Sequence, residues 1–257
     1  MSSNEYTFSF ENDEMFFYVI ENMAILKLKN QFLTKISDIE KSSKIFSVIE
    51  WVEKDPIVNS LLIFNEEYAF SQIEYCQFMD SVTQFDKESV RYIVLPEKKL
   101  QLVRQIHAIR IFIKKIICYE KNVIFCLNGD VSTLAFALSL TGDYRFANSS
   151  FSISLPNKKY DFPPVGGLPF LLSKYLGQQK ANNIILEGRS IDAMNSKELN
   201  LINEIIENDS FEQKCIDKAK TLAVGGDNYR KISKHLINYY SQQMDDYFNY
   251  ETKISGF

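Results

Sequence analysis

Backbone amides at one strand-to-helix turn are the groups in this sequence best placed to do chemistry. The apolar run 123–127 is typical of a buried strand, and Asn128-Gly129-Asp130 follows it as a turn. A helix-forming apolar segment, residues 134–141, comes next. The first N–H groups of a helix have no partner inside the helix, so they can hydrogen-bond an oxygen that becomes negative during a reaction. The spacing therefore predicts a backbone oxyanion site at this turn.

The apolar periodicity indicates which elements must position that turn. Two strand-like runs, 16–20 and 23–28, flank a two-residue turn and predict a hairpin. Residues 97–120 have the clearest helical pattern, with His107 on the apolar face as a packing residue. Residues 71–90 are expected to be irregular first and helical afterwards. Further helices are expected at 36–54, 166–176, 179–187, 194–200, 211–223 and 228–250, and further strands at 61–64, 123–127, 144–147 and 151–155.

The composition excludes several functional classes. A formal net charge of −4 over 257 residues gives no support for nucleic-acid binding, so no nucleic-acid partner is expected. No window approaches the roughly 18 uninterrupted apolar residues of a membrane span, and no signal peptide is visible at the N-terminus. We therefore expect a cytoplasmic protein with no membrane contact. Wide spacing of the cysteines argues against a zinc or disulfide framework and predicts free thiols and no metal site. The four cysteines are Cys76, Cys118, Cys126 and Cys215.

Several motifs between residues 128 and 203 occur in the order of one known family. The chain resembles the crotonase (enoyl-CoA hydratase/isomerase) superfamily from about residue 14 to 250, as a divergent member. The matching segments are Asn128-Gly129 … Gly142-Asp143, Pro164-Val165-Gly166-Gly167 … Tyr175-Leu176-Gly177, Ala181 … Leu186-Glu187-Gly188-Arg189-Ser190-Ile191-Asp192-Ala193, and Asn200-Leu201-Ile202-Asn203.

This resemblance implies an α/β fold built as a spiral of β-β-α units with two nearly perpendicular sheets. It implies a crotonase-like core over residues 1–195 and a C-terminal helical trimerisation region over residues 196–257. The expected assembly is a homotrimer, or a hexamer made of two trimers. The expected substrate is an acyl-CoA or an acyl-pantetheine thioester on a carrier protein, with no separate cofactor.

The resemblance also assigns roles to individual residues. The first oxyanion donor of the family corresponds to the backbone N–H of Gln72. The second corresponds to the N–H of Leu134, where the family's Gly-Gly-Gly reads Thr133-Leu134-Ala135. Both hydratase glutamates are absent, and their positions are Ala137 and Asn157. Because hydration needs one group to activate water and one to handle the α-proton, the sequence predicts a member that is not a standard hydratase.

Other side chains are candidates for the missing acid–base groups. Asp161, in the loop 157–164, lies where the resemblance places the active site, and a solvated loop position is its alternative. His235, on the expected C-terminal helix, resembles a histidine of decarboxylating crotonase homologues in polyketide β-branching pathways, and a solvent-facing position is its alternative. Tyr160 is a candidate neutral donor or a packing residue. Glu74 and Asp130 flank the two donor turns and are close enough in sequence to approach a ligand.

Three functions fit these residues. The chain binds an acyl thioester and stabilises its enolate through backbone amides, as a lyase or isomerase with non-standard groups. Alternatively, it is a catalytically silent homologue that serves as a binding or assembly subunit. The third alternative is a decarboxylase of a polyketide-type β-branching pathway.

Overall fold

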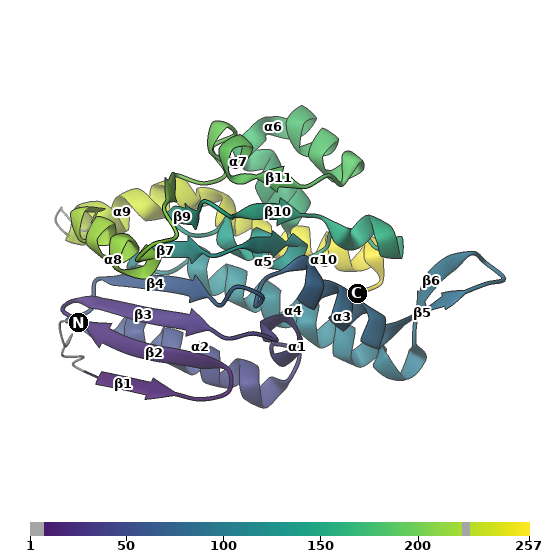
Figure 1. Cartoon of the computed structure of the whole chain (residues 1–257), viewed down its shortest axis with the longest axis horizontal. Coiled ribbons are helices and arrows are strands. Elements are labelled where there is room, and N and C mark those ends of the chain that lie inside the picture. Colours follow the sequence, from purple (N-terminus) through teal and green to yellow (C-terminus); the bar gives the residue numbers. More distant parts are fainter. Residues whose placement is uncertain (1–7, 223–226) are drawn as a thin grey trace.

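A seven-stranded sheet forms the centre of the computed structural model, which describes residues 8–222 and 227–257 (Figure 1). The strand order of this sheet is β1-β2-β3-β4-β7-β9-β12, and a second sheet has the order β11-β10-β8. The described strands are β1 (Phe8–Glu11), β2 (Met15–Ile20), β3 (Met23–Leu28), β4 (Ser60–Asn65), β5 (Thr83–Asp86), β6 (Arg91–Val94), β7 (Asn122–Leu127), β8 (Asp130–Ser132), β9 (Tyr144–Asn148), β10 (Ser152–Ser154), β11 (Ile191–Asp192) and β12 (Glu204–Ile206).

Helices cover both faces of the large sheet. The described α-helices are α1 (Phe32–Lys35), α2 (Ile39–Lys54), α3 (Gln72–Val82), α4 (Lys99–Ile117), α5 (Thr133–Ser139), α6 (Leu168–Glu187), α7 (Ala193–Glu198), α8 (Phe211–Leu222), α9 (Asp227–Ile237) and α10 (Met244–Ser255). Three 3-10 turns are η1 (Pro96–Lys98), η2 (Pro156–Tyr160) and η3 (Asn238–Gln243). The mixed α/β content and the mostly helical C-terminal region confirm the predicted fold class.

The predicted hairpin is present, and the strands beyond it are parallel. Strands β2 and β3 pair with Ile20 opposite Met23, and Glu21 in the turn has a φ of 53°. From β3 to β12 the neighbouring strands are parallel. Every residue of β4 is buried, as is typical of a parallel strand covered on both faces.

Side chains alternate between two cores on either side of the sheet. Ala24 and Leu26 belong to the large core, where α2, α4 and α5 pack, while Ile25 faces the smaller core. Helix α8 covers the smaller core with Cys215 and Ile216. This separation places α3 and α5 on the large-core side, where the predicted donor turns lie.

Our expectation for residues 71–90 was wrong in its order. Helix α3 comes first and begins at Gln72, because the Ser71 hydroxyl accepts a hydrogen bond from the Glu74 N–H and so caps the helix. The hairpin of β5 and β6 follows and projects from the body of the molecule (Figure 1). The residues after α3 therefore form a projecting β-hairpin and not a helix.

The expected role of His107 was also wrong. Helix α4 forms as predicted, and Ile106, Ile109 and Ile113 are buried in the large core. The His107 side chain is exposed, although its neighbours Ile106 and Ala108 are buried. His107 is therefore a surface residue.

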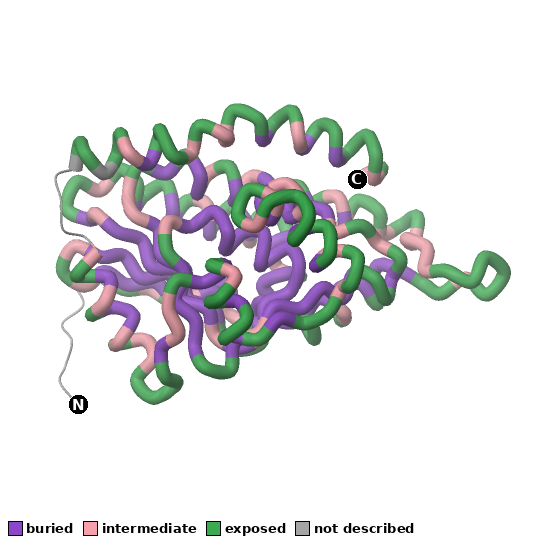
Figure 2. Tube along the Cα trace, turned by 90° about the horizontal axis from the view of Figure 1, so that it is seen from above, coloured by how far each residue is buried: buried purple, intermediate pink, exposed green. Residues whose placement is uncertain are grey.

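The C-terminal segment crosses one side of the molecule as a broken helix. The helix expected over 228–250 is divided into α9, η3 and α10. Figure 2 shows this run with exposed turns facing away from the body and buried turns against it. Strand β12 lies within residues 196–257 and pairs with β9, so this segment also contributes to the large sheet. The division at residue 195 stays a prediction.

Candidate functional site

The two predicted donor turns lie side by side. The Ser132 N–H donates to the Phe70 carbonyl oxygen at 2.7 Å, which joins the end of β8 to the residue pair before α3. Helix α3 starts at Gln72 and helix α5 starts at Thr133. The fold therefore brings together two backbone segments that are about sixty residues apart in the chain, as the resemblance implied.

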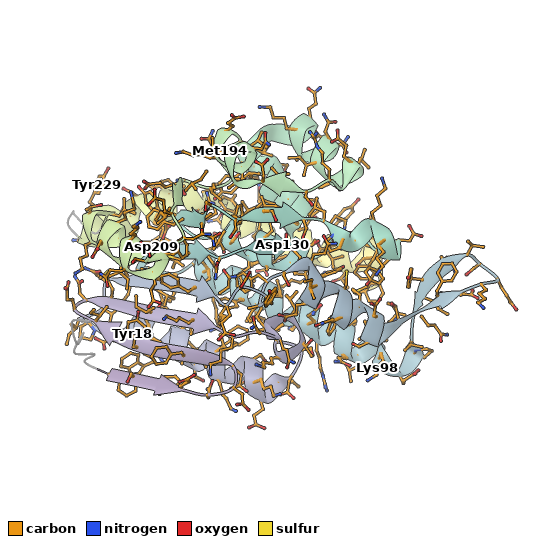
Figure 3. The ribbon with its side chains drawn as sticks, in the orientation of Figure 1. Tyr18, Lys98, Asp130, Met194, Asp209 and Tyr229 are labelled. Carbon is orange, nitrogen blue, oxygen red and sulfur yellow. The ribbon has the colours of Figure 1, made fainter. Side chains whose placement is uncertain are left out.

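The first predicted donor already has an acceptor. The Gln72 N–H donates to Oδ2 of Asp130 at 2.6 Å. The Ser154 hydroxyl donates to the same oxygen and the Ser152 hydroxyl donates to Oδ1, both at 3.0 Å. Asp130 is half-buried and lies near the middle of the ribbon in Figure 3. A carboxylate therefore occupies the N–H of the first predicted donor.

The second predicted donor lies in a closely packed turn. The Leu134 side chain is buried, and its Cδ2 lies 2.6 Å from where a Cβ on Gly166 would stand. Gly166 has a φ of 84°, so this close approach and this backbone conformation both require glycine. No side chain caps the N-terminus of α5, so the backbone N–H groups of its first turn donate no hydrogen bond to a capping side chain and are open to other acceptors.

Neither lost-glutamate position supplies an acid or a base. Ala137 is fully buried in α5. Asn157 is buried, its amide oxygen accepts from the Thr133 hydroxyl, and its amide nitrogen donates to the Tyr75 hydroxyl at 2.9 Å and the Pro163 carbonyl at 3.2 Å. Burial raises the pKa of the Tyr75 phenol far above its usual range, so this hydroxyl stays neutral. Asn157 is therefore part of a neutral hydrogen-bonded network.

Glu74 faces the protein and not a ligand. Its carboxylate accepts hydrogen bonds from the backbone N–H groups of Gln31, at 2.9 Å, and Leu33. Burial raises the pKa of Glu74 to about 8, against the opposite effect of these backbone N–H groups. This carboxyl therefore ties α3 to the start of α1.

The remaining candidates are dispersed. Asp161 is exposed in a left-handed conformation with a φ of 50° at the end of η2. Tyr160 is buried and donates to Asp80 at 2.8 Å, which makes it a packing residue. His235 is exposed on α9. The structure brings Gln72, Leu134 and Asp130 to the joined turns and leaves the two speculative acid–base residues on the surface.

Two cavities adjoin this region. A cavity of about 420 Å³ has mostly apolar walls and includes Asn157 and Asp161 in its lining. A wider cavity of about 590 Å³ lies between α1, α2 and α4 and has Lys35, Lys41 and Arg104 in its lining. The described residues contain no group of three or more His, Cys, Asp or Glu that could hold a metal ion. Over the same residues, none of the helices has both the length and the apolar character to cross a bilayer.

Comparisons with known proteins agree on one family. The family described as enoyl-CoA hydratase/isomerase matches residues 107–256, which is more than half of the chain. The human chromodomain Y-like protein is 24% identical over 141 residues, 55% of this chain and 24% of that protein. Mouse peroxisomal enoyl-CoA delta isomerase 3 is 24% identical over 135 residues, 52% of this chain and 43% of that protein. The chain thus spans less than half the length of these two relatives.

Solved structures share the whole fold. An enoyl-CoA hydratase/isomerase from Xanthobacter autotrophicus Py2 superimposes with a TM-score of 0.76 at 16% sequence identity. The superposition covers 95% of this chain and 87% of that one. The crotonase fold expected from the motifs is therefore confirmed.

Proposed function

The chain belongs to the enoyl-CoA hydratase/isomerase family, and from this premise we propose that it binds an acyl-CoA thioester without hydrating it. The observation that carries the proposal is the bond between the Ser132 N–H and the Phe70 carbonyl, which holds the turns of Gln72 and Leu134 together. Preorganised N–H groups stabilise an enolate oxygen more than a neutral carbonyl oxygen, since they act where charge develops.

Loss of hydration follows from the side chains at the two glutamate positions. Ala137 cannot exchange a proton, and the amide of Asn157 is already bonded to Thr133 and Tyr75. Activation of water requires a base within hydrogen-bond reach of it. Thioester binding without water addition is the chemistry that remains for such a site.

The cavity between α1, α2 and α4 supports CoA as the carrier of the acyl group, because Lys35, Lys41 and Arg104 outnumber Asp38 and Glu40 in its lining. Gln31, which lines this cavity, also donates its N–H to Glu74 in the first turn of α3. The cavity therefore begins close to Gln72. Among the described residues, neither Lys41 nor Arg104 forms an ion pair, so both are available to phosphate oxygens. A CoA thioester brings its own phosphates, whereas the pantetheine of a carrier protein does not bring the nucleotide.

The apolar cavity supports an acyl chain as the other part of the ligand. Phe162, Ile185 and Leu186 contribute to its walls, and Lys158 and Asp161 add charge to its lining. Its volume of about 420 Å³ falls in the ordinary range of roughly 300–1,000 Å³ for small-ligand sites. In this proposal Asp161 contacts the ligand only at the opening of the cavity.

Thermal unfolding with crotonyl-CoA tests the proposal. A ligand at one hundred times its dissociation constant adds about 2.7 kcal/mol of stability, or roughly 5–11 °C in Tm for a chain of this size. We expect such a rise with crotonyl-CoA, a smaller one with crotonyl-pantetheine, and no loss of the enoyl absorbance on incubation. Arg104→Ala should reduce the preference for the CoA ester, while Lys87→Ala, on the projecting hairpin, should not. Absence of stabilisation by crotonyl-, acetyl- and malonyl-CoA would reject CoA thioester binding.

An assembly subunit is the second candidate function. A stripe of exposed apolar side chains at helical spacing favours it: Tyr229, Ile232, Leu236 and Tyr239, on α9 and η3. Exposed stripes of this kind mark contact surfaces between proteins. We propose that this stripe contributes to a homotrimer or a pair of trimers. The decarboxylase alternative requires His235 to reach a ligand, and its exposed position gives it less support.

A further inference from the structure

We infer that Asp130 is a specificity-determining residue that competes with the thioester oxygen for the Gln72 N–H and selects against the enolate. This inference rests on the proposed function, because it concerns the same donor turn. It assigns to Asp130 an intramolecular contact that any acyl ligand must displace.

The contact is built by the pairing of two short strands. In the parallel pair of β8 and β10, Asp130 lies opposite Ser152 and Val131 lies opposite Ile153. Residues two apart in a strand share a face, so Ser152 and Ser154 both present hydroxyls to Asp130. These hydroxyls donate to the two carboxylate oxygens at 3.0 Å each. The two serine side chains therefore fix the position of the carboxylate, and neither serine is one of the predicted oxyanion donors.

The held carboxylate lies on the first donor itself. Its Oδ2 accepts from the Gln72 N–H at 2.6 Å, in the range of charge-assisted hydrogen bonds. One N–H directed at Oδ2 is not available to a thioester oxygen at the same time. Bonds to a charged acceptor are also stronger than bonds to a neutral one, so a thioester carbonyl replaces the carboxylate at a net loss.

The charge of Asp130 adds a second effect. No lysine or arginine among the described residues forms an ion pair with Asp130. An enolate oxygen that takes the place of Oδ2 at the Gln72 N–H would stand close to the remaining negative charge of this carboxylate, and like charges at short range repel. The carboxylate should therefore disfavour the enolate more strongly than the neutral thioester. Removal of the charge should shift the bound ligand toward its enolate.

Acetoacetyl-CoA is a suitable probe, because its enolate has an ultraviolet band of its own. The variants are Asp130→Asn, which keeps the shape and removes the charge, and Asp130→Ala, which also removes the acceptor of the Gln72 N–H. Asp209→Asn is the matched control, since it removes an exposed carboxylate that lines neither of the two proposed ligand cavities. Circular dichroism and thermal unfolding establish that each variant is folded. If Asp130→Ala does not fold, Asp130→Asn carries the test alone.

We expect both Asp130 variants to bind acetoacetyl-CoA at least tenfold more tightly than the unmodified protein and to increase the enolate band per bound ligand. Asp209→Asn should change neither quantity. Equal affinity and an equal enolate band in the unmodified protein and the Asp130 variants would overturn the competition and leave thioester binding standing. If folded Asp130 variants and the unmodified protein all fail to bind, both the inference and the proposed function are wrong.

Discussion

Removal of the Glu251 carboxylate should destabilise the packing of the C-terminal helix α10 against the core. Glu251, on α10, is buried and its Oε2 accepts from Nε and Nη2 of Arg110 at 3.0 and 2.7 Å. The same carboxylate accepts from the N–H groups of Gly166 and Gly167 at 2.9 and 3.0 Å. Glu251→Ala therefore removes the charged partner of a buried guanidinium, which keeps only the Thr252 hydroxyl and the Phe257 carbonyl as acceptors. It also leaves two backbone N–H groups without their acceptor.

The magnitude follows from the burial of both partners. The side chains of Arg110 and Glu251 are only 10% and 6% exposed. Removal of one partner from a buried pair costs roughly 3–5 kcal/mol, because the remaining charge is uncompensated. For a chain of this size that corresponds to a Tm lower by roughly 6–20 °C. Urea unfolding followed by circular dichroism measures the free energy directly.

The same two helices offer a matched control. Lys114 of α4 and Asp245 of α10 form an ion pair at 2.5 Å, with side chains 46% and 65% exposed. Asp245→Ala should cost at most about 1 kcal/mol, since exposed pairs contribute little. The double variant Arg110→Met, Glu251→Leu should recover part of the loss, because it leaves no buried charge. An unfolding free energy for Glu251→Ala within about 1 kcal/mol of that for Asp245→Ala would refute the assigned role.

Three further predictions concern pH, backbone strain and assembly. The pKa of Glu74 is raised from 4.5 to about 8 in the folded protein, so the contribution of this carboxyl to stability is complete below pH 4.5 and is lost as pH rises through about 8. Glu74→Gln should therefore reduce the dependence of the unfolding free energy, measured in urea, on pH between 4.5 and 8. The same pH dependence in the variant and the unmodified protein would contradict the burial of this carboxyl. Gly166→Ala should cost about 2–5 kcal/mol from left-handed strain and overlap with Leu134. Gly256→Ala should cost about 1–2 kcal/mol, because Gly256 is left-handed with a φ of 78° and an added Cβ meets no side chain within 4 Å. Equal losses by thermal unfolding would contradict the close approach. Leu236→Glu should lower the mass measured by light scattering from that of a trimer or hexamer toward that of one chain, and an unchanged mass would remove the α9 stripe from the interface.

Much of the fold was predictable because its signals are local. The hairpin around Glu21 follows from two apolar runs and a short turn, and the helix over 97–120 follows from its apolar period. The order of α3 and the β5–β6 hairpin was missed, because the Ser71 cap is a weaker sequence signal than the apolar pattern after it. The burial of His107 was predicted wrongly, because the apolar period of a helix with a wide apolar face does not show which residues lie at the border of that face.

The site divides in the same way. The sequence by itself determined that Ala137 and Asn157, which the resemblance places at the glutamate positions, carry no acid or base, since the identity of a side chain limits its chemistry whatever surrounds it. Only the tertiary structure decided that Asp130 reaches the N–H of Gln72, 58 residues away. That contact depends on the register of β8 with β10 and on the approach of two turns, and these distances are products of packing across the whole core. The residue types alone therefore exclude acid–base chemistry at Ala137 and Asn157, whereas the contact of Asp130 with the Gln72 N–H depends on the fold.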